Sequence, residues 1–148
     1  MASDAAITAR RVPIRAGLLT TPLSDLDAVR LIGSRCDTCS ETTLGKNSIC
    51  PNCGGEAVSE LPLSGRGQLW TYTVVRHRPP GNYQGPEPFE PFALGLVELP
   101  DGLRVLTPIE GDFAHLRIGM ELEFRAFVRA AGATPEVVSF AFTPAARR

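Results

Sequence analysis

The sequence predicts a mainly β protein in which a small metal-bound ribbon precedes a closed five-stranded barrel. Two observations carry this prediction. Four cysteines occur in two closely spaced C-x-x-C pairs, and the second half of the chain repeats apolar residues with a period of two between turn-forming residues. The chain has 148 residues, of which 43% are hydrophobic, and this suffices for one core of modest size.

The four cysteines predict a metal site. Cys36 and Cys39 form the first pair, Cys50 and Cys53 form the second, and the sequence has no other cysteine. Two such pairs joined by a short linker place four thiolates in a tetrahedron of the size that zinc prefers. The alternative is two disulfides, but two-residue disulfide loops belong mainly to redox proteins. Four sulfur ligands leave no open coordination position, so we expect a structural ion, zinc or its substitute iron.

The chain divides into three expected segments: an N-terminal arm and lead-in over residues 1–30, a zinc ribbon over 31–61, and a barrel over 62–148. In the lead-in, Ser24 is positioned to cap a short helix over 25–29. The N-terminal arm itself has no clear pattern.

The barrel segment has five expected strands, over residues 68–76, 92–99, 103–109, 120–128 and 137–142. Pro100-Asp101-Gly102 predicts a tight turn between the second and third, because proline fixes φ and glycine accepts a left-handed backbone. A short helical turn is expected within 111–119. Five strands with a helical element between the third and fourth are typical of the oligonucleotide/oligosaccharide-binding fold (OB-fold), whose closure removes exposed strand edges.

The longest irregular segment, residues 79–91, joins the first two barrel strands and is rich in proline. Long loops without secondary structure are usually functional or disordered, and proline stiffens this one. We expect a contact surface for a partner or a phosphorylated ligand, because arginine grips phosphate and tyrosine can stack on adenine. The alternatives are an idle loop and a solvated strand end. The candidate contact residues are Arg76, His77, Arg78, Tyr83 and Phe89.

No catalytic residue is expected. A metal would occupy every cysteine, no Ser-His-Asp pattern is visible, and Gly65-Arg66-Gly67 lacks the rest of a phosphate-binding fingerprint. His77 is expected at the surface, and His115 in a structural role. Trp70 and Tyr72 are expected in the core or at a subunit interface rather than in a base-stacking platform.

Charge and hydropathy argue against two classes of partner. The net charge is -1, and four metal-bound thiolates would make it more negative. Nucleic-acid binding normally needs a basic excess, so we expect no nucleic acid as partner. No apolar run has the length of a membrane span, and the N-terminus lacks a signal-peptide segment. We therefore expect a cytoplasmic protein without a membrane partner, whose cysteines stay reduced for metal.

Segments on both sides of the cysteines carry a family resemblance. They are Leu31-Ile32-Gly33-Ser34-Arg35-Cys36, Ser64-Gly65-Arg66-Gly67-Gln68-Leu69-Trp70-Thr71-Tyr72-Thr73-Val74, Pro91-Phe92-Ala93-Leu94-Gly95-Leu96-Val97-Glu98-Leu99, Gly102, and Ile118-Gly119-Met120. With the cysteine spacing, these segments resemble the acyl-CoA-associated proteins that join a rubredoxin-like zinc ribbon to an OB-fold, a family long known only as a domain of unknown function. Two positions depart from the family pattern: Ser40 stands where glycine often follows the second cysteine, and residues 41–46 lack a frequent Pro-Arg pair.

The resemblance implies a partnership. Members resemble small subunits beside thiolase-like enzymes, and some accompany hydratase or aldolase components that act on CoA thioesters. The expected function is thus a non-catalytic accessory subunit of a thiolase-type complex, which aids assembly and substrate binding. The expected partner is a thiolase-like subunit in a hetero-oligomer, with the acyl-CoA reached through the complex. The alternatives are a subunit of an acyl-CoA hydratase or aldolase, an OB-fold binder of single-stranded nucleic acid, and a freestanding acyl-CoA carrier or enzyme.

Overall fold

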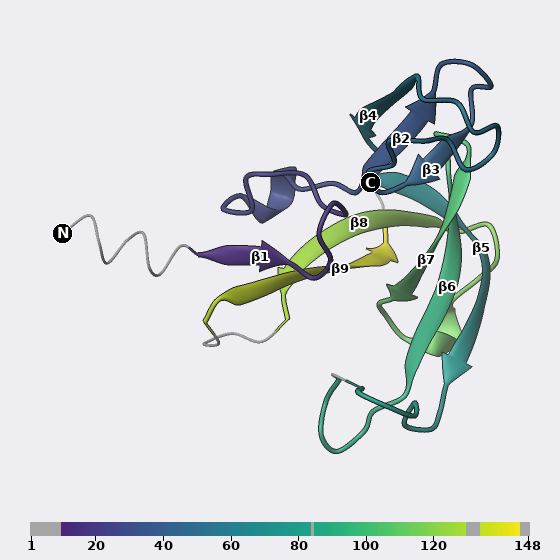
Figure 1. The fold of residues 1–148 in the computed structure, drawn as a ribbon. Helices are drawn as coiled ribbons and strands as arrows, with labels where there is room; N and C mark the ends of the chain where they lie inside the picture. Colours follow the sequence, from purple (N-terminus) through teal and green to yellow (C-terminus); the bar gives the residue numbers. More distant parts are fainter. Residues whose placement is uncertain (1–9, 84, 130–133, 146–148) are drawn as a thin grey trace.

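The computed structural model describes residues 10–83, 85–129 and 134–145, and it consists of two β-sheets (Figure 1). Most of the N-terminal arm expected from the sequence, residues 1–9, and residue 84 of the loop over 79–91 lie outside the described part. The strands of the larger sheet are β1 (Arg11–Pro13), β5 (Arg66–Val75), β6 (Phe92–Leu99), β7 (Leu103–Ile109), β8 (Glu121–Val128) and β9 (Glu136–Pro144). The smaller sheet contains β2 (Ile32–Cys36), β3 (Thr42–Leu44) and β4 (Val58–Pro62).

The larger sheet closes on itself. Strand β5 pairs with β6 on one side and with β8 on the other, β6 pairs with β7, and β8 pairs with β9. The last junction is a parallel contact of β7 with β9, at Ile109 and Phe142. This connectivity is that of a five-stranded OB-fold barrel, so the predicted fold class is confirmed. Strand β1 adds to the barrel by running parallel to β9.

The alternating pattern of the sequence places one side of each strand inside the barrel. In β6, Ala93, Val97 and Leu99 are buried, and in β7, Val105 and Ile109 are buried. Thr107, between these two residues, is also buried, and the alternate positions Arg104, Leu106 and Pro108 are exposed. Burial of one face in this way sets the strand register, since a slip by one residue would turn the apolar set outward. The predicted turn between these strands is also present: Gly102 has φ +99°, and its N–H donates to the carbonyl of Leu99 at 3.1 Å.

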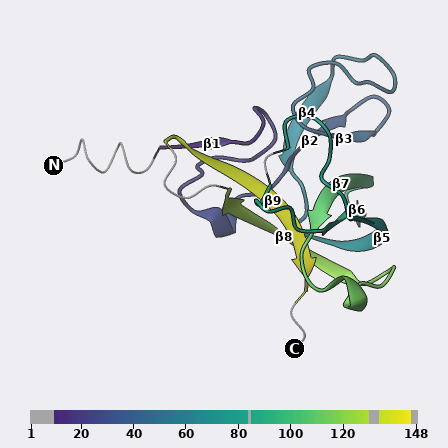
Figure 2. The same cartoon turned by 90° about the horizontal axis from the view of Figure 1, so that it is seen from below.

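The ribbon packs directly against the barrel. Strand β2 lies between β3 and β4, both antiparallel to it, and the ribbon stands at one end of the barrel (Figures 1 and 2). Leu31 and Leu63 at the ribbon's base belong to the same buried cluster as barrel residues. Gly33 of β2 contacts this cluster closely, because a Cβ at that position would lie 2.4 Å from Cδ2 of Leu63. The two sheets therefore share one core.

The helical predictions are correct in one place and wrong in another. Residues Phe113–His115 form the expected short turn, a 3-10 turn in which Asp112 Oδ1 accepts from the N–H of Ala114 at 3.0 Å. The helix expected over 25–29 is only a 3-10 turn at Leu26–Ala28, and its cap position is held by Asp25 without a side-chain hydrogen bond, not by Ser24. The turn ends after three residues because Val29 has an extended backbone, with φ -69° and ψ 139°. No helix within the described ranges is long and apolar enough to cross a membrane.

Candidate functional site

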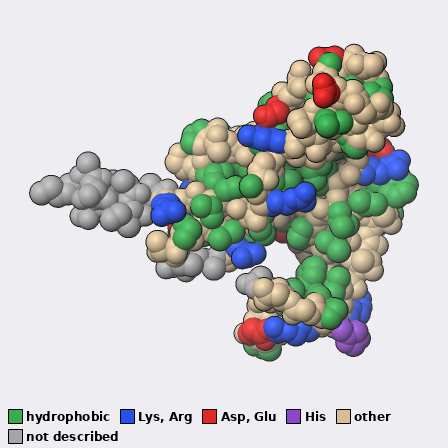
Figure 3. All heavy atoms as spheres, in the orientation of Figure 1, with side chains coloured by type: hydrophobic (Ala, Val, Ile, Leu, Met, Phe, Trp, Pro, Cys, Tyr) green, Lys and Arg blue, Asp and Glu red, His purple; other side chains and the backbone are tan. Residues whose placement is uncertain are grey.

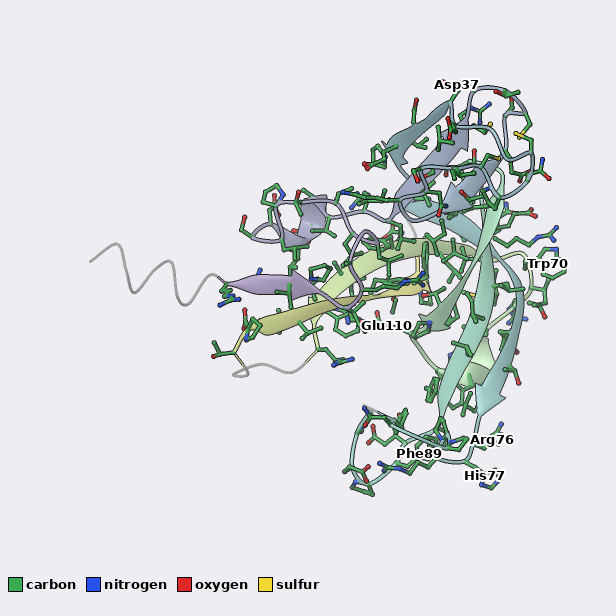
Figure 4. The ribbon with its side chains drawn as sticks, in the orientation of Figure 1. Asp37, Trp70, Arg76, His77, Phe89 and Glu110 are labelled. Atoms are coloured by element: carbon green, nitrogen blue, oxygen red, sulfur yellow. The ribbon has the colours of Figure 1, made fainter. Side chains whose placement is uncertain are left out.

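The four cysteines converge at the ribbon end farthest from the barrel. Cys36 ends β2, and the other three lie in the turns that precede β3 and β4. Their four Sγ atoms lie within 4.8 Å of one another, and the sulfurs are visible near Asp37 in Figure 4. The Cys36–Cys53 sulfurs are 3.6 Å apart and the Cys39–Cys50 sulfurs 3.7 Å apart. These distances are far from the ~2 Å of a disulfide. They match the ~3.8 Å edge of a tetrahedron with metal–sulfur bonds of ~2.3 Å.

The backbone builds the two knuckles alike. The N–H of Cys36 donates to the carbonyl of Glu41 at 2.9 Å, and the N–H of Cys50 donates to that of Gly55 at 2.8 Å. The residue after each second cysteine closes the turn. The N–H of Ser40 donates to the carbonyl of Cys36, and the N–H of Gly54 donates to the carbonyl of Cys50, both at 2.9 Å. Each C-x-x-C pair is thus a closed turn that fixes its two sulfurs.

The equivalent positions Ser40 and Gly54 share a left-handed backbone. Their φ angles are +67° and +77°. Glycine adopts this conformation freely, whereas a residue with a Cβ meets the carbonyl oxygen. Ser40 is the one non-glycine residue with positive φ within the described ranges. The departure from the family pattern at Ser40 therefore falls where the knuckle backbone demands glycine most.

The thiols have unequal proton affinities. The side-chain amide of Asn52 donates to Sγ of Cys39 at 3.5 Å and, with the N–H of Glu41, lowers the pKa of Cys39 to about 6. At Cys53 the N–H of Gly55 lowers the pKa, but the neighbouring thiols and desolvation outweigh it and raise the pKa to about 11. Four thiolates this close repel one another unless a cation lies between them. The set could therefore hold one metal ion such as zinc, all four sulfurs being ligands.

The loop that joins β5 and β6 is closed by its own side chains. The ring of Tyr83 stacks on Phe92 with centroids 6.2 Å apart, and Phe89 meets both rings edge-on at 5.7 and 6.3 Å. The guanidinium of Arg78 lies over Tyr83, 5.5 Å from the ring centre, and also pairs with Glu87. Tyr83 and Phe89, which the sequence offers as contact residues, are half-buried, because they pack on each other and on Phe92.

The basic triplet, which consists of Arg76, His77 and Arg78 directly after β5, does not converge on one binding site. All three side chains are exposed, but Arg78 turns toward Tyr83 and Glu87 of the loop, whereas Arg76 and His77 project on the other side, away from Phe89 (Figure 4). His115 lies far along the chain, in its 3-10 turn, with Nδ1 3.5 Å from Oδ2 of Asp112.

Trp70 does not lie in the core, one of the two places that the sequence predicts for it, and its place at a subunit interface stays a prediction. Tyr72 packs against the core, as the alternating pattern suggests, but Trp70 is 45% exposed. The pairing of β5 with β6 shifts between Leu69 and Thr71, so Trp70 is the extra residue of a β-bulge. Its ring lies 3.9 Å from the guanidinium carbon of Arg104. No local signal in the sequence marks a bulge, which depends on the partner strand.

Comparisons with known proteins agree with this architecture. The family described as "ChsH2, C-terminal OB-fold domain" matches residues 60–128. The DUF35 domain-containing scaffold protein of Pyrococcus furiosus is 37% identical over 97 residues, which cover 64% of this chain and 66% of that protein. The benzoylsuccinyl-CoA thiolase subunit BbsA of Thauera aromatica is 34% identical over 107 residues, which cover 72% of this chain and 69% of that subunit.

A solved structure of the Ltp2-ChsH2(DUF35) aldolase superposes with a TM-score of 0.60 at 30% identity, and the match covers 78% of this chain and 84% of that one. This chain belongs to the DUF35 family. The resemblance seen in the sequence is confirmed. The chain spans about two thirds of the length of the curated relatives named above.

Proposed function

We propose that this DUF35 chain is a non-catalytic accessory subunit of a thiolase-type complex that acts on acyl-CoA thioesters in the cytoplasm. One observation carries the proposal: the chain matches, over more than two thirds of both lengths, a protein that is itself a thiolase subunit. The catalytic subunit would supply the nucleophile and bind the substrate's reacting end. This chain would stabilise the assembly and contribute to substrate binding from outside that centre.

The sulfur cluster supports a scaffold role over a catalytic one. We propose that Cys36, Cys39, Cys50 and Cys53 hold one zinc ion, which would join the knuckles and supply no open coordination position. An acyl-enzyme step needs a free thiolate or an activated hydroxyl. Within the described residues all four thiols point to the same site, so none stands apart as a nucleophile.

We propose the loop over 79–91 as one surface that contacts the partner or its bound CoA. Its aromatic cluster supports this proposal, because an internally packed loop loses little conformational entropy on docking. Arg76 and His77 are exposed at its base and would be available to a phosphate of CoA. Tyr83, Phe89 and Arg78 would instead hold the loop's shape.

Two other functions remain as alternatives. The likeness to a DUF35 chain of an aldolase favours an aldolase-type catalytic partner, so the partner's reaction is the part of this proposal that needs a direct test. Binding of single-stranded nucleic acid has less support. The outward positions of β6 and β7, where an OB-fold would present stacking aromatic rings, carry one aromatic ring, Phe92, beside the aliphatic Leu94, Leu96 and Leu106.

The proposal is tested by purifying the tagged chain from its native host and identifying its stoichiometric partner by mass spectrometry. We expect a thiolase-type subunit and turnover of an acyl-CoA by the pair. An aldolase or hydratase subunit would support the alternative within the same family. Recovery of the chain free of any such enzyme, or with nucleic acid in a salt-sensitive complex, would contradict an accessory role.

A further inference from the structure

The outer face of β5, β6 and β7 carries exposed apolar side chains that the fold does not explain. Leu106 is 61% exposed and Trp70 is 45% exposed. The register brings them together: Leu106 lies opposite Leu96, and Leu96 lies opposite Thr71, beside the bulged Trp70. Figure 3 shows hydrophobic side chains at the surface over β6 and β7. We call Trp70, Leu96 and Leu106 the barrel patch.

The Trp70 ring is held in place rather than left mobile. The guanidinium of Arg104 lies 3.9 Å from the ring centre, and its Nε donates to Oε2 of Glu98 at 3.0 Å. Glu98 and Arg104 are directly opposite each other on β6 and β7. The three side chains thus cross the sheet as one stack. Tryptophan and arginine dominate binding hot spots, and a ring already ordered loses less entropy on docking.

The charges around the barrel patch indicate the class of partner. Arg104 is neutralised by Glu98, and the neighbouring outward positions Gln68, Thr71 and Thr73 are uncharged. An apolar centre with a neutral polar border is the anatomy of a protein–protein contact. A nucleic acid or an anionic membrane would instead require unpaired basic side chains at this border.

The barrel patch is continuous with the loop proposed above as a contact surface. The outward positions of β6 run from Phe92 through Leu94 to Leu96. Phe92 is the ring on which Tyr83 and Phe89 of the loop pack, and Leu96 belongs to the barrel patch. One apolar line along β6 therefore connects the loop's aromatic cluster with Trp70.

We propose that the barrel patch docks onto the same catalytic subunit that the loop contacts, so that β6 forms the axis of one continuous interface. The inference rests on the proposed accessory function. Trp70 would be the central anchor, Leu106 the apolar contact beside it, and Arg104 the residue that positions the indole. A second copy of this chain is the competing occupant.

The test compares two substitutions that are matched in exposure. Leu106 and Ile118 are both 61% exposed, but Ile118 lies in the turn before β8, outside the barrel patch. The probe is the catalytic subunit that copurifies with the parent chain, separated and then titrated with each variant. We expect Leu106→Asp to weaken binding at least tenfold, Trp70→Ala to do the same, and Ile118→Asp to change it less than twofold. Metal content and circular dichroism check that each variant is folded.

A second readout follows the indole itself. Trp70 is the only tryptophan of the chain, so 5-fluorotryptophan gives a single ¹⁹F signal. We expect this signal to shift on addition of the catalytic subunit and to become protected from a paramagnetic probe in solvent. If the parent binds while Leu106→Asp binds equally well and the ¹⁹F signal stays unchanged, this inference fails and the accessory function stands. A parent dimer that Leu106→Asp dissociates would also overturn it, whereas a parent that binds no such subunit refutes both.

Discussion

Exchange of the residues at the two equivalent knuckle positions tests whether the ribbon's backbone is strained at Ser40. The perturbation is a pair of single substitutions, Ser40→Gly and Gly54→Ser. Ser40 has φ +67° and Gly54 has φ +77°, and a Cβ at Gly54 would meet no atom within 4 Å. We therefore expect the two substitutions to change the free energy of unfolding in opposite directions. Both effects have one cause, the cost of a side chain on a left-handed backbone.

The magnitude follows from two opposing terms. A left-handed conformation costs a residue with a Cβ about 1–2 kcal/mol. Glycine itself lowers the free energy of unfolding by about 0.4–1 kcal/mol, because it makes the unfolded chain more flexible. We therefore expect Ser40→Gly to raise the free energy of unfolding by about 0.5–1 kcal/mol and Gly54→Ser to lower it by a similar amount. For a chain of this length, each change corresponds to about 1–4 °C in Tm.

The assay is thermal and denaturant unfolding of the metal-loaded variants at fixed zinc concentration, since ligand concentration shifts apparent stability. Metal content is measured for each variant, so that a change in stability is not a change in loading. Opposite shifts of similar size would support the equivalence of the knuckles. If Ser40→Gly is neutral or destabilising while Gly54→Ser destabilises, the Ser40 side chain contributes something other than strain, and the reasoning is refuted.

Three further predictions concern the metal, the shared core and the loop. Cys50→Ser should release the metal and unfold the ribbon, seen as loss of zinc by elemental analysis; an unchanged zinc content would contradict four-sulfur binding. Gly33→Ala should destabilise the whole chain by about 1–3 kcal/mol in denaturant unfolding, because its Cβ would lie 2.4 Å from Cδ2 of Leu63; loss of the ribbon alone would argue against one core. The double change Arg76→Ala with His77→Ala should raise the Michaelis constant of the complex for acyl-CoA several-fold. Folding should be unchanged, since both side chains are exposed. An unchanged Michaelis constant would show that these two side chains take no part in substrate binding.

The parts of the fold that were predictable are those set by local pattern. The cysteine spacing identified the sulfur cluster, and the period-two segments gave β6 and β7 with the observed bounds, because burial of one face determines both. The helix expected over 25–29 is wrong for a tertiary reason: the backbone is extended from Val29, and the next residues pair with a distant segment through the N–H of Thr20, which donates to the carbonyl of Arg30.

The contact surfaces were harder to predict from sequence, because they depend on pairings between distant residues. The bulge that turns Trp70 outward exists only in the register with β6, and its partner Arg104 comes from β7. The Arg78 side chain likewise points away from Arg76 and His77, because it contacts Glu87 and Tyr83 of the loop. A sequence pattern identifies which residues could bind, but the pairing of strands decides which of them face outward.

The most direct test of the accessory function is reconstitution of activity from separated subunits. Acyl-CoA cleavage is measured for the zinc-loaded chain alone, for the copurifying catalytic subunit alone, and for the two mixed at equal concentration. The account predicts no turnover by this chain alone and a rate for the mixture well above that of the catalytic subunit. Turnover by the isolated chain, or an equal rate for the catalytic subunit with and without it, would contradict the central claim.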